Sequence, residues 1–486
     1  MPGMTDGHVH LYKEEGKVFR DAALYLSKGV TTVFNMRGDS THFAWRDMVR
    51  NGNLIAPYIY TCGEFINEPL VNSPEEVTNE VLSQQSQGVD FLKFHEYFSD
   101  KERRYLTTEG VSKESFNRLM ATAKTVGLPV TGHGMYDPDF ENLLEQGMSL
   151  AHLSGFLEYQ LFPDGQEKFQ AAFPKMKWLL SLIVTISIIL FIIFQKTRKL
   201  LLILGVSTLL FFGVWFNTIW LGNNLMILLM IVSAATILFL TVFITVKIRL
   251  AKSTNLNILS KMALVIPTTL FGYYVILLWI PIFLKNTDGA LDELIHKAKG
   301  SSIITTMIVE DPNWSMLDHG ESLKYLPEPI AERWSNLKGE PSNFIDRWVH
   351  STPKMSYWYL AEKKLLRKLK KHGINVVAGT DAMGFPLMVP GYSAHYELKL
   401  IHENGYSAFE TLQTATRNPA KFLNQESNFG TIEKGKRADM VLLNSNPLED
   451  IEAINSIEGV LVNGNWINKE GLSHMLDSLN IKNSIN

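Results

Sequence analysis

Two histidines stand two residues apart near the start of the chain, in the segment Pro2-Gly3-Met4-Thr5-Asp6-Gly7-His8-Val9-His10. The alternation of apolar and polar residues before them is typical of a β-strand, in which side chains at i and i+2 point to the same side. Two imidazoles on one face at the end of a strand can chelate one metal ion. Two histidines that only pack or face solvent give the same pattern, so the pair requires further ligands.

Later predicted strands supply polar residues of the kind that serve metal chemistry. They are Lys93, His133, His152 and Asp381. In a parallel barrel, side chains at the carboxyl ends of the strands converge on one mouth. Four imidazoles and one carboxylate suit zinc or another divalent transition ion. A lysine ammonium repels cations, but a lysine carboxylated by carbon dioxide becomes a carbamate that can bridge two metals.

Each of these residues also has a purely structural interpretation. Histidines at strand ends are often hydrogen-bonded core groups, Lys93 could extend its ammonium to water, and Asp381 could cap a turn. Their joint occurrence, each at the end of a strand and in chain order, favours a common site.

The elements that position these residues alternate between strand and helix, which predicts βα units around a parallel sheet and an α/β fold. The predicted strands cover residues 30–34, 58–61, 89–94, 129–133, 149–152, 302–309 and 373–381. The predicted helices cover residues 18–27, 77–87, 112–126, 140–146, 288–299 and 358–371, and a capping box at Ser407–Glu410 opens another. After Gly430, short β segments alternate with turns.

Composition excludes several classes of protein. The net charge of −3 and the pI near 6.5 give no basic face for nucleic acid. The single cysteine, Cys62, excludes an internal disulfide and a cysteine-rich metal site. The mean hydropathy of +0.02 is high for a chain with 20% charged residues, and it reflects a hydrophobic block in the middle of the chain.

That block contains four apolar runs of about membrane-spanning length without ionisable residues, namely Trp178–Phe194, Leu200–Leu221, Leu225–Val246 and Met262–Leu284. Core helices of a soluble protein are the alternative. The runs predict a multi-pass membrane protein with the lipid bilayer as a partner. Basic residues in the first and third links place the flanking parts, by the positive-inside rule, on the extracytoplasmic side. The absence of ionisable residues in the runs argues against transport and favours a tether that would hold the site near the bilayer and near lipophilic small molecules.

The motifs resemble those of the amidohydrolase superfamily, in its imidazolonepropionase-like and Xaa-Pro dipeptidase-like branches. The matching segments are residues 2–10, 90–93, 129–133, 151–152, 379–382, 415–420 and 430–439. The resemblance implies a (β/α)8 TIM-like barrel, here interrupted by the four spans, and a partial C-terminal β-sandwich. The expected domains are residues 1–173 and 287–429 for the barrel, 174–286 for the membrane block and 430–486 for the sandwich. The N-terminal partner strands of such a sandwich are expected to be absent.

Carried over to this chain, the resemblance implies two divalent metal ions, with zinc favoured. His8, His10 and Asp381 would hold one ion, His133 and His152 the other, and carboxylated Lys93 would lie between them. A metal-activated hydroxide would attack the C–N bond of an amide, dipeptide or cyclic amide, and Asp381 would transfer the proton. His95 and Tyr97 share the strand parity of Lys93 and are predicted to line the substrate pocket.

Two other functions remain open. One is a mononuclear imidazolonepropionase-type hydrolase or deaminase in which Lys93 is not carboxylated. The other is an inactive membrane sensor or scaffold that retains a relic barrel. The number of bound metal ions separates the first of these from a binuclear enzyme, and loss of hydrolysis on substitution of Lys93 or Asp381 separates an enzyme from a scaffold. The oligomeric state does not follow from these patterns.

Overall fold

The computed structural model describes residues 1–67, 70–95, 97–98, 106–107, 111–134, 140–156, 288–311, 314, 319–335 and 353–483. The chain divides into two compact units. The first comprises Met1–Tyr159, Asp292–Ser351 and Ala361–Asn486, and the second comprises Gln160–Leu291 and Thr352–Leu360. Every predicted site residue belongs to the first unit.

Eight short strands of the first unit form two sheets in which every pairing is parallel. The first sheet has the order β1 (Met4–Val9), β2 (Val30–Asn35) and β3 (Tyr58–Thr61). The second has the order β10 (Asn375–Val377), β9 (Ser302–Ile304), β8 (Ser149–Leu150), β7 (Val130–Gly132) and β4 (Leu92–Phe94). Most of their residues are buried, as expected for parallel strands covered on both faces. The structure thus confirms the predicted α/β class.

Backbone hydrogen bonds connect the two sheets at both edges. Ile66, which follows β3, forms a parallel bridge with Phe94 of β4. At the other edge, Val9 of β1 forms a parallel bridge with Ala382, which follows β10. The amide of Gly7 also donates to the carbonyl oxygen of Ala378 at 2.8 Å. Each of these eight parallel strands is therefore linked to the next of the eight along the chain, and β10 is linked to β1.

Most helices begin and end where local sequence signals place them. Ser112 and Ser407 accept hydrogen bonds from the third residue of their helices, and Ser407 forms the predicted capping box with Glu410. Gly127 ends its helix in the left-handed conformation that glycine adopts without strain. The helices are α1 (Ala22–Ser27), α2 (Ser40–Arg50), α3 (Pro74–Ser86), α4 (Lys113–Val126), α5 (Phe140–Glu145), α11 (Asp288–Lys297), α12 (Gly320–Leu323), α13 (Glu328–Ser335), α15 (Pro353–Lys371), α16 (Tyr392–Glu403), α17 (Ala408–Thr414), α18 (Arg417–Phe422) and α19 (Lys469–Asn483).

One predicted strand ends earlier than the sequence suggests. The run of β-branched residues 302–309 predicts a single strand, but β9 ends at Ile304 and the 3₁₀ helix η3 covers Met307–Val309. Between them, Thr306 has a φ of 48°, in the left-handed region that a β-branched residue rarely adopts. Tertiary contacts override the local preference for extended backbone at this position.

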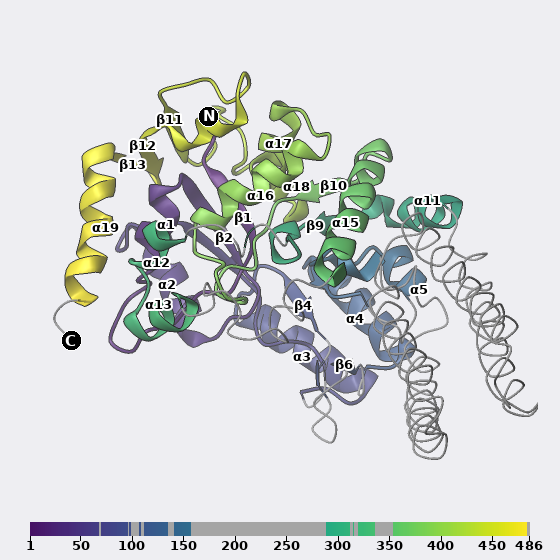
Figure 1. Cartoon of the computed structure of the whole chain (residues 1–486). Coiled ribbons are helices and arrows are strands. Elements are labelled where there is room, and N and C mark those ends of the chain that lie inside the picture. Colours follow the sequence, from purple (N-terminus) through teal and green to yellow (C-terminus); the bar gives the residue numbers. More distant parts are fainter. Residues whose placement is uncertain are drawn as a thin grey trace, which may run out of the picture. The chain divides into compact units, whose positions relative to one another are not determined.

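The C-terminal segment forms an antiparallel sheet of β11 (Met440–Leu443), β12 (Ile457–Val462) and β13 (Asn465–Asn468). Pro2 bridges Met440, and Met1 exchanges backbone hydrogen bonds with Val441, so the first residues extend this sheet. Leu472 of α19 packs with the buried valines of β12, and Figure 1 shows α19 in yellow close to the label of β13. The proposed separation of residues 430–486 as a domain stays a prediction.

The predicted membrane localisation requires correction. The four apolar runs and the predicted domain limits near residues 173 and 287 lie outside the described residues. Within the part of the chain that the structure describes, no helix has both the length and the apolar character needed to cross a bilayer. The longest described helix, α15, has 19 residues and carries six lysines and arginines in its last two-thirds, which is too many charges for a membrane span. This finding contradicts the assignment as a multi-pass membrane protein with an extracytoplasmic catalytic domain.

Candidate metal centre

Strands β1 and β10 bring together His8, His10 and Asp381, which we call the first ligand group. The Nε2 atom of His8 lies 3.5 Å from Oδ1 of Asp381, and Nε2 of His10 lies 3.0 Å from the same oxygen. One potential ligand atom from each residue lies within 4.8 Å of the other two. Ligands bonded at 2.0–2.2 Å in a tetrahedral site are roughly 3.3–3.6 Å apart, so these separations fit one zinc-sized ion. His8 and Asp381 are buried, and the His10 side chain is 31% exposed, which leaves the group open to solvent on one side.

A backbone hydrogen bond fixes the tautomer of His8. Its Nδ1 atom lies 3.1 Å from the carbonyl oxygen of Ala151, which follows β8. A carbonyl oxygen only accepts, so Nδ1 carries the proton and the Nε2 lone pair faces Asp381. Burial lowers the pKa of His8 well below its usual value, which keeps the imidazole neutral. Two buried acceptor atoms therefore face each other, an arrangement that a shared cation stabilises.

The backbone after β10 sets the position of Asp381. Its amide donates to the carbonyl oxygen of His8 at 2.8 Å, and the amide of His10 donates to Ala382 at 2.9 Å. Asp381 itself adopts a φ of 58°, which is uncommon for a residue with a side chain. Gly384 lies so close that a Cβ atom there would sit 2.3 Å from Oδ1 of Asp381 and 2.7 Å from Cδ2 of His10. The close approach requires glycine.

The second ligand group comprises Lys93, His133 and His152, and it adjoins the first. The ring of His152 lies 4.7 Å from that of His8 and 4.8 Å from that of His133. Burial lowers the pKa of His133 and lowers that of His152 to about 3, and the positive charge of the buried Lys93 lowers both further. The two imidazoles are thus neutral and able to bind a metal, with Lys93 close enough to act on both.

The structure places His95 and Tyr97 differently from one another. The ring of His95 lies 4.0 Å from that of His133 and stacks on Phe65 at 4.6 Å, so it continues the row of imidazoles. Strand β4 ends at Phe94, and Tyr97 belongs to the separate hairpin of β5 (Tyr97–Phe98) and β6 (Leu106–Thr107). The shared strand parity with Lys93 therefore does not extend to Tyr97, and its side chain lies outside the description.

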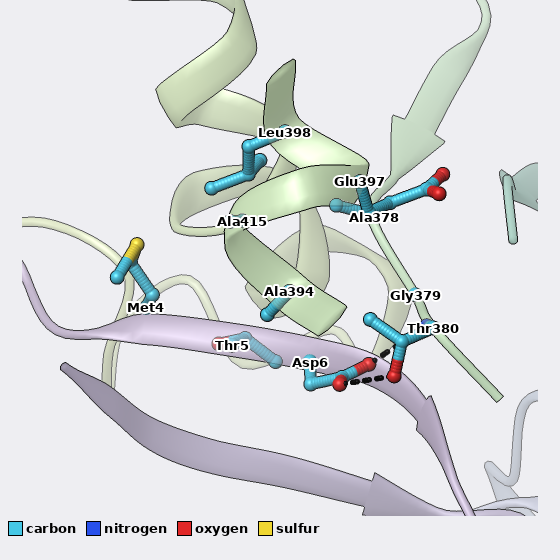
Figure 2. A pocket seen from close by; sticks show the side chains of 10 residues that line it. All are labelled: Met4, Thr5, Asp6, Ala378, Gly379, Thr380, Ala394, Glu397, Leu398 and Ala415. Atoms are coloured by element: carbon cyan, nitrogen blue, oxygen red, sulfur yellow. Dashed lines mark hydrogen bonds between the residues drawn. The ribbon is translucent and has the colours of Figure 1, made fainter. Parts of the chain in front are cut away.

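Asp6 is a site residue that the sequence reasoning missed. Its Oδ2 accepts a hydrogen bond from Oγ1 of Thr380 at 2.6 Å, and its Oδ1 accepts one from the amide of Thr380 at 3.0 Å (Figure 2). Its Oδ1 also accepts from the amide of His8 at 3.3 Å. Burial raises the pKa of Asp6 to about 7. The carboxyl holds Thr380 next to Asp381 and so ties β1 to the residues after β10. Its parity with His8 on the same strand is the signal that could have identified it.

Parts of the chain are similar in sequence to known proteins. A model described as the Amidohydrolase family matches residues 361–467, the segment that contains Asp381. These residues are therefore similar in sequence to members of that family. An imidazolonepropionase from Thermoanaerobacter pseudethanolicus is 36% identical over 96 residues, which cover 19% of this chain and 22% of that protein. A 5-methylthioadenosine/S-adenosylhomocysteine deaminase from Caldanaerobacter subterraneus subsp. tengcongensis is 34% identical over 123 residues, 21% of this chain and 28% of that protein.

A crystal structure of a Xaa-Pro dipeptidase with bound methionine in the active site has a TM-score of 0.51 and 18% identity. The match covers 96% of this chain and 86% of that one. At this identity the likeness concerns the fold alone. The chain spans only about a quarter of the curated relatives that it matches by sequence. The sequence comparisons thus support a resemblance to the amidohydrolase superfamily, and the structural comparison supports a similar fold.

Proposed function

We propose that this protein is a metal-dependent hydrolase of C–N bonds in small amides, dipeptides or cyclic amides. The observation that carries the proposal is the first ligand group, in which a neutral histidine nitrogen and a carboxylate oxygen face each other at 3.5 Å with a second histidine in reach. Such a buried nitrogen–oxygen set suits a divalent transition ion, with zinc favoured. Such an ion can activate water and polarise a carbonyl for hydrolysis.

The protein's own side chains supply the remaining requirements. His8, His10 and Asp381 would hold one ion, and the Ala151 carbonyl oxygen keeps Nε2 of His8 available to it. His8 and His10 keep the pKa of Asp381 below its ordinary value, against the effect of burial, so this residue remains a carboxylate. A carboxylate at the opening beside His10 can accept a proton from the attacking water and deliver it to the leaving nitrogen.

The second ligand group extends the proposal to two metal ions. His133 and His152 would bind the second ion, and Lys93, once carboxylated, would bridge the pair. Carboxylation converts a cation that repels metals into an anion that binds them. The close ring contacts of His152 with both His8 and His133 support one shared centre. His95 extends this row and is proposed, with Tyr97, to line the substrate pocket.

For the fold, we propose that the eight parallel strands close into one (β/α)8 barrel with the ligands at its carboxyl mouth. The bridges between Ile66 and Phe94 and between Val9 and Ala382 support closure at both sheet edges. His10 and Asp381 both follow the ends of their strands, as expected for ligands at this mouth. The antiparallel sheet after residue 430 would then be part of a β-sandwich beside the barrel.

A mononuclear hydrolase or deaminase is the second candidate function. The sequence matches to an imidazolonepropionase and to a deaminase favour it, since both matches are closer in identity than the dipeptidase structure. In that enzyme Lys93 would remain an uncarboxylated amine, and a single ion would occupy the first ligand group.

Metal analysis combined with a substrate panel tests both functions. The purified full chain is stripped with a chelator, reloaded with zinc, and assayed on Xaa-Pro dipeptides, N-acyl amino acids, a cyclic imidazolone and an aminopurine nucleoside. We expect hydrolysis of an amide that zinc restores and that His10→Ala abolishes. Ammonia release from the nucleoside with one ion per chain would favour the mononuclear enzyme. Equal hydrolysis by the stripped protein, the reloaded protein and the variant would overturn the metal-dependent function.

A further inference from the structure

Glu397 of α16 is a fully buried carboxyl group that the proposed reaction does not use. Its Oε1 accepts a hydrogen bond from the hydroxyl of Thr305 and another from the amide of Met307 at 3.1 Å. Its Oε2 accepts from the amide of Ile308 at 2.8 Å. Thr305 follows β9, and Met307 and Ile308 are the first residues of η3. One side chain of α16 therefore fixes this β9–η3 turn (residues 305–308), about 90 residues earlier in the sequence. Figure 2 shows the Glu397 carboxyl pointing away from Asp6 and Thr380.

Thr306 lies at the centre of this turn and contacts a proposed metal ligand. Its Oγ1 lies 2.7 Å from Nδ1 of His152. Its φ of 48° is strained for a β-branched residue, and such strain persists only where the surroundings determine the conformation. The hydrogen bonds that Glu397 accepts from residues on both sides of Thr306 hold the backbone in this conformation. The strained backbone is what directs the hydroxyl to the histidine.

We propose that Glu397 is a positioning residue that acts through Thr306 to orient the imidazole of His152 for metal binding. With Thr306 as the partner of Nδ1, the Nε2 atom of His152 is left for the ion. A group that hydrogen-bonds the second nitrogen of a ligating histidine sets both its tautomer and its direction. This inference rests on the proposed function for the metal role of His152, whereas the orientation of the ring does not depend on catalysis.

The chain offers a conservative pair of variants and a matched control. Thr306→Val removes the hydroxyl at nearly constant shape, and Thr306→Ser retains it. Glu397→Gln places an amide donor among three donors that require an acceptor. Glu362 of α15 is also a buried glutamate with a raised pKa, and it interacts electrostatically with Glu397. It has no hydrogen bond to the β9–η3 turn among the described contacts, so Glu362→Gln controls for the loss of a buried acid.

Two measurements on the purified full chain test the inference. The first is the imidazole ¹⁵N spectrum of the metal-free protein labelled on histidine, with His152→Asn used to assign the signals. We expect one tautomer of His152 to predominate in the wild type, and the tautomers to mix in Thr306→Val and Glu397→Gln. Thr306→Ser and Glu362→Gln should keep the wild-type spectrum. The second is zinc affinity by competition with a chromophoric chelator, for which we expect a loss of about 10–100-fold in the first two variants only.

The outcomes separate this inference from the proposed function. An unchanged His152 spectrum in both Thr306→Val and Glu397→Gln overturns the inference, even if the protein hydrolyses amides. An equal spectral change in Glu362→Gln overturns it as well, because any buried acid would then have the same effect. A specific change in the spectrum and in zinc affinity supports it, even if no amide in the panel is hydrolysed.

Discussion

The first and second ligand groups differ in how far the encoded side chains complete them. In the first group, three residues already bring two nitrogens and an oxygen within 4.8 Å of one another. It is the only group of three such residues within the described part of the chain. The second group has two imidazoles and a buried lysine, whose ammonium repels a cation. On the proposed function, the first site would form on folding, whereas the second would gain a third ligand only by carboxylation of Lys93.

The strongest test of this comparison is the removal of a ligand from the first group. Asp381→Asn keeps the size of the side chain but removes the charge that both histidines face. We expect kcat/KM to fall by more than about 100-fold, since outer hydrogen-bond partners of metal ligands alone are worth 10–100-fold. Metal content and kcat/KM are measured together on the purified variant. Full activity with full metal content would remove the first group from the mechanism.

Substitution of Lys93 addresses the second group. Lys93→Ala should lower the metal content from two ions to one and reduce activity by about 10–100-fold, while the first group keeps its ion. In the wild type, incubation with ¹³C-bicarbonate should give a carbamate signal in the ¹³C spectrum that the variant lacks. One ion per wild-type chain and no carbamate signal would instead mean that Lys93 is not carboxylated. That result would favour the mononuclear enzyme.

Acid stability offers a way to separate metal loss from unfolding. His395 lies outside both groups, and burial lowers its pKa from 6.5 to about 4. Its unfolded form binds a proton below pH 6.5 while its folded form does not, so its stabilising contribution is present above that pH and is lost as the pH falls. Between pH 7 and pH 5 we expect the free energy of unfolding to decrease by about 2 kcal/mol from this residue.

Urea unfolding of the metal-free chain at a series of pH values measures this decrease, and His395→Asn should flatten it. If metal release between pH 7 and pH 5 follows the same curve in His395→Asn as in the wild type, the release reflects the ligand groups. A release curve that shifts together with the unfolding curve would show that acid acts on the whole fold.

The sequence predicted the positions of the candidate ligands better than it predicted the residues that hold those ligands in place. His8 and His10 are two positions apart and Asp381 follows a strongly apolar predicted strand, so local periodicity suffices to place all three at strand ends. Thr306 carries no such signal, because its left-handed backbone depends on Glu397, which is 91 positions away in the sequence. Hydrogen bonds over such separations arise from packing and leave no trace in local periodicity.

The ends of the helices and strands show the same contrast between local signals and tertiary contacts. Ser407 and Gly127 lie at the ends of helices as their chemistry predicts. The run 302–309 predicted an unbroken strand, and it fails after Ile304 because three buried hydrogen bonds to Glu397 outweigh the preference of β-branched residues for extended backbone. The largest error concerns the apolar runs. Their length and composition alone predicted a membrane localisation, and the lack of a membrane-spanning helix among the described residues contradicts it.

The smallest expected effect concerns the glycine that lies against the first group. Gly384→Ala would place a Cβ atom 2.3 Å from Oδ1 of Asp381, so the carboxylate or the loop must move by roughly 1 Å to restore ordinary van der Waals contact. Because the displaced atom is a proposed ligand, we expect kcat/KM to fall by about 10-fold, with little change in thermal stability. Gly300→Ala is the matched control, since a Cβ atom at Gly300 meets no other atom within 4 Å. Equal activity of the two variants would mean that the first group tolerates displacement, and the contrast with the second group would then lose its structural basis.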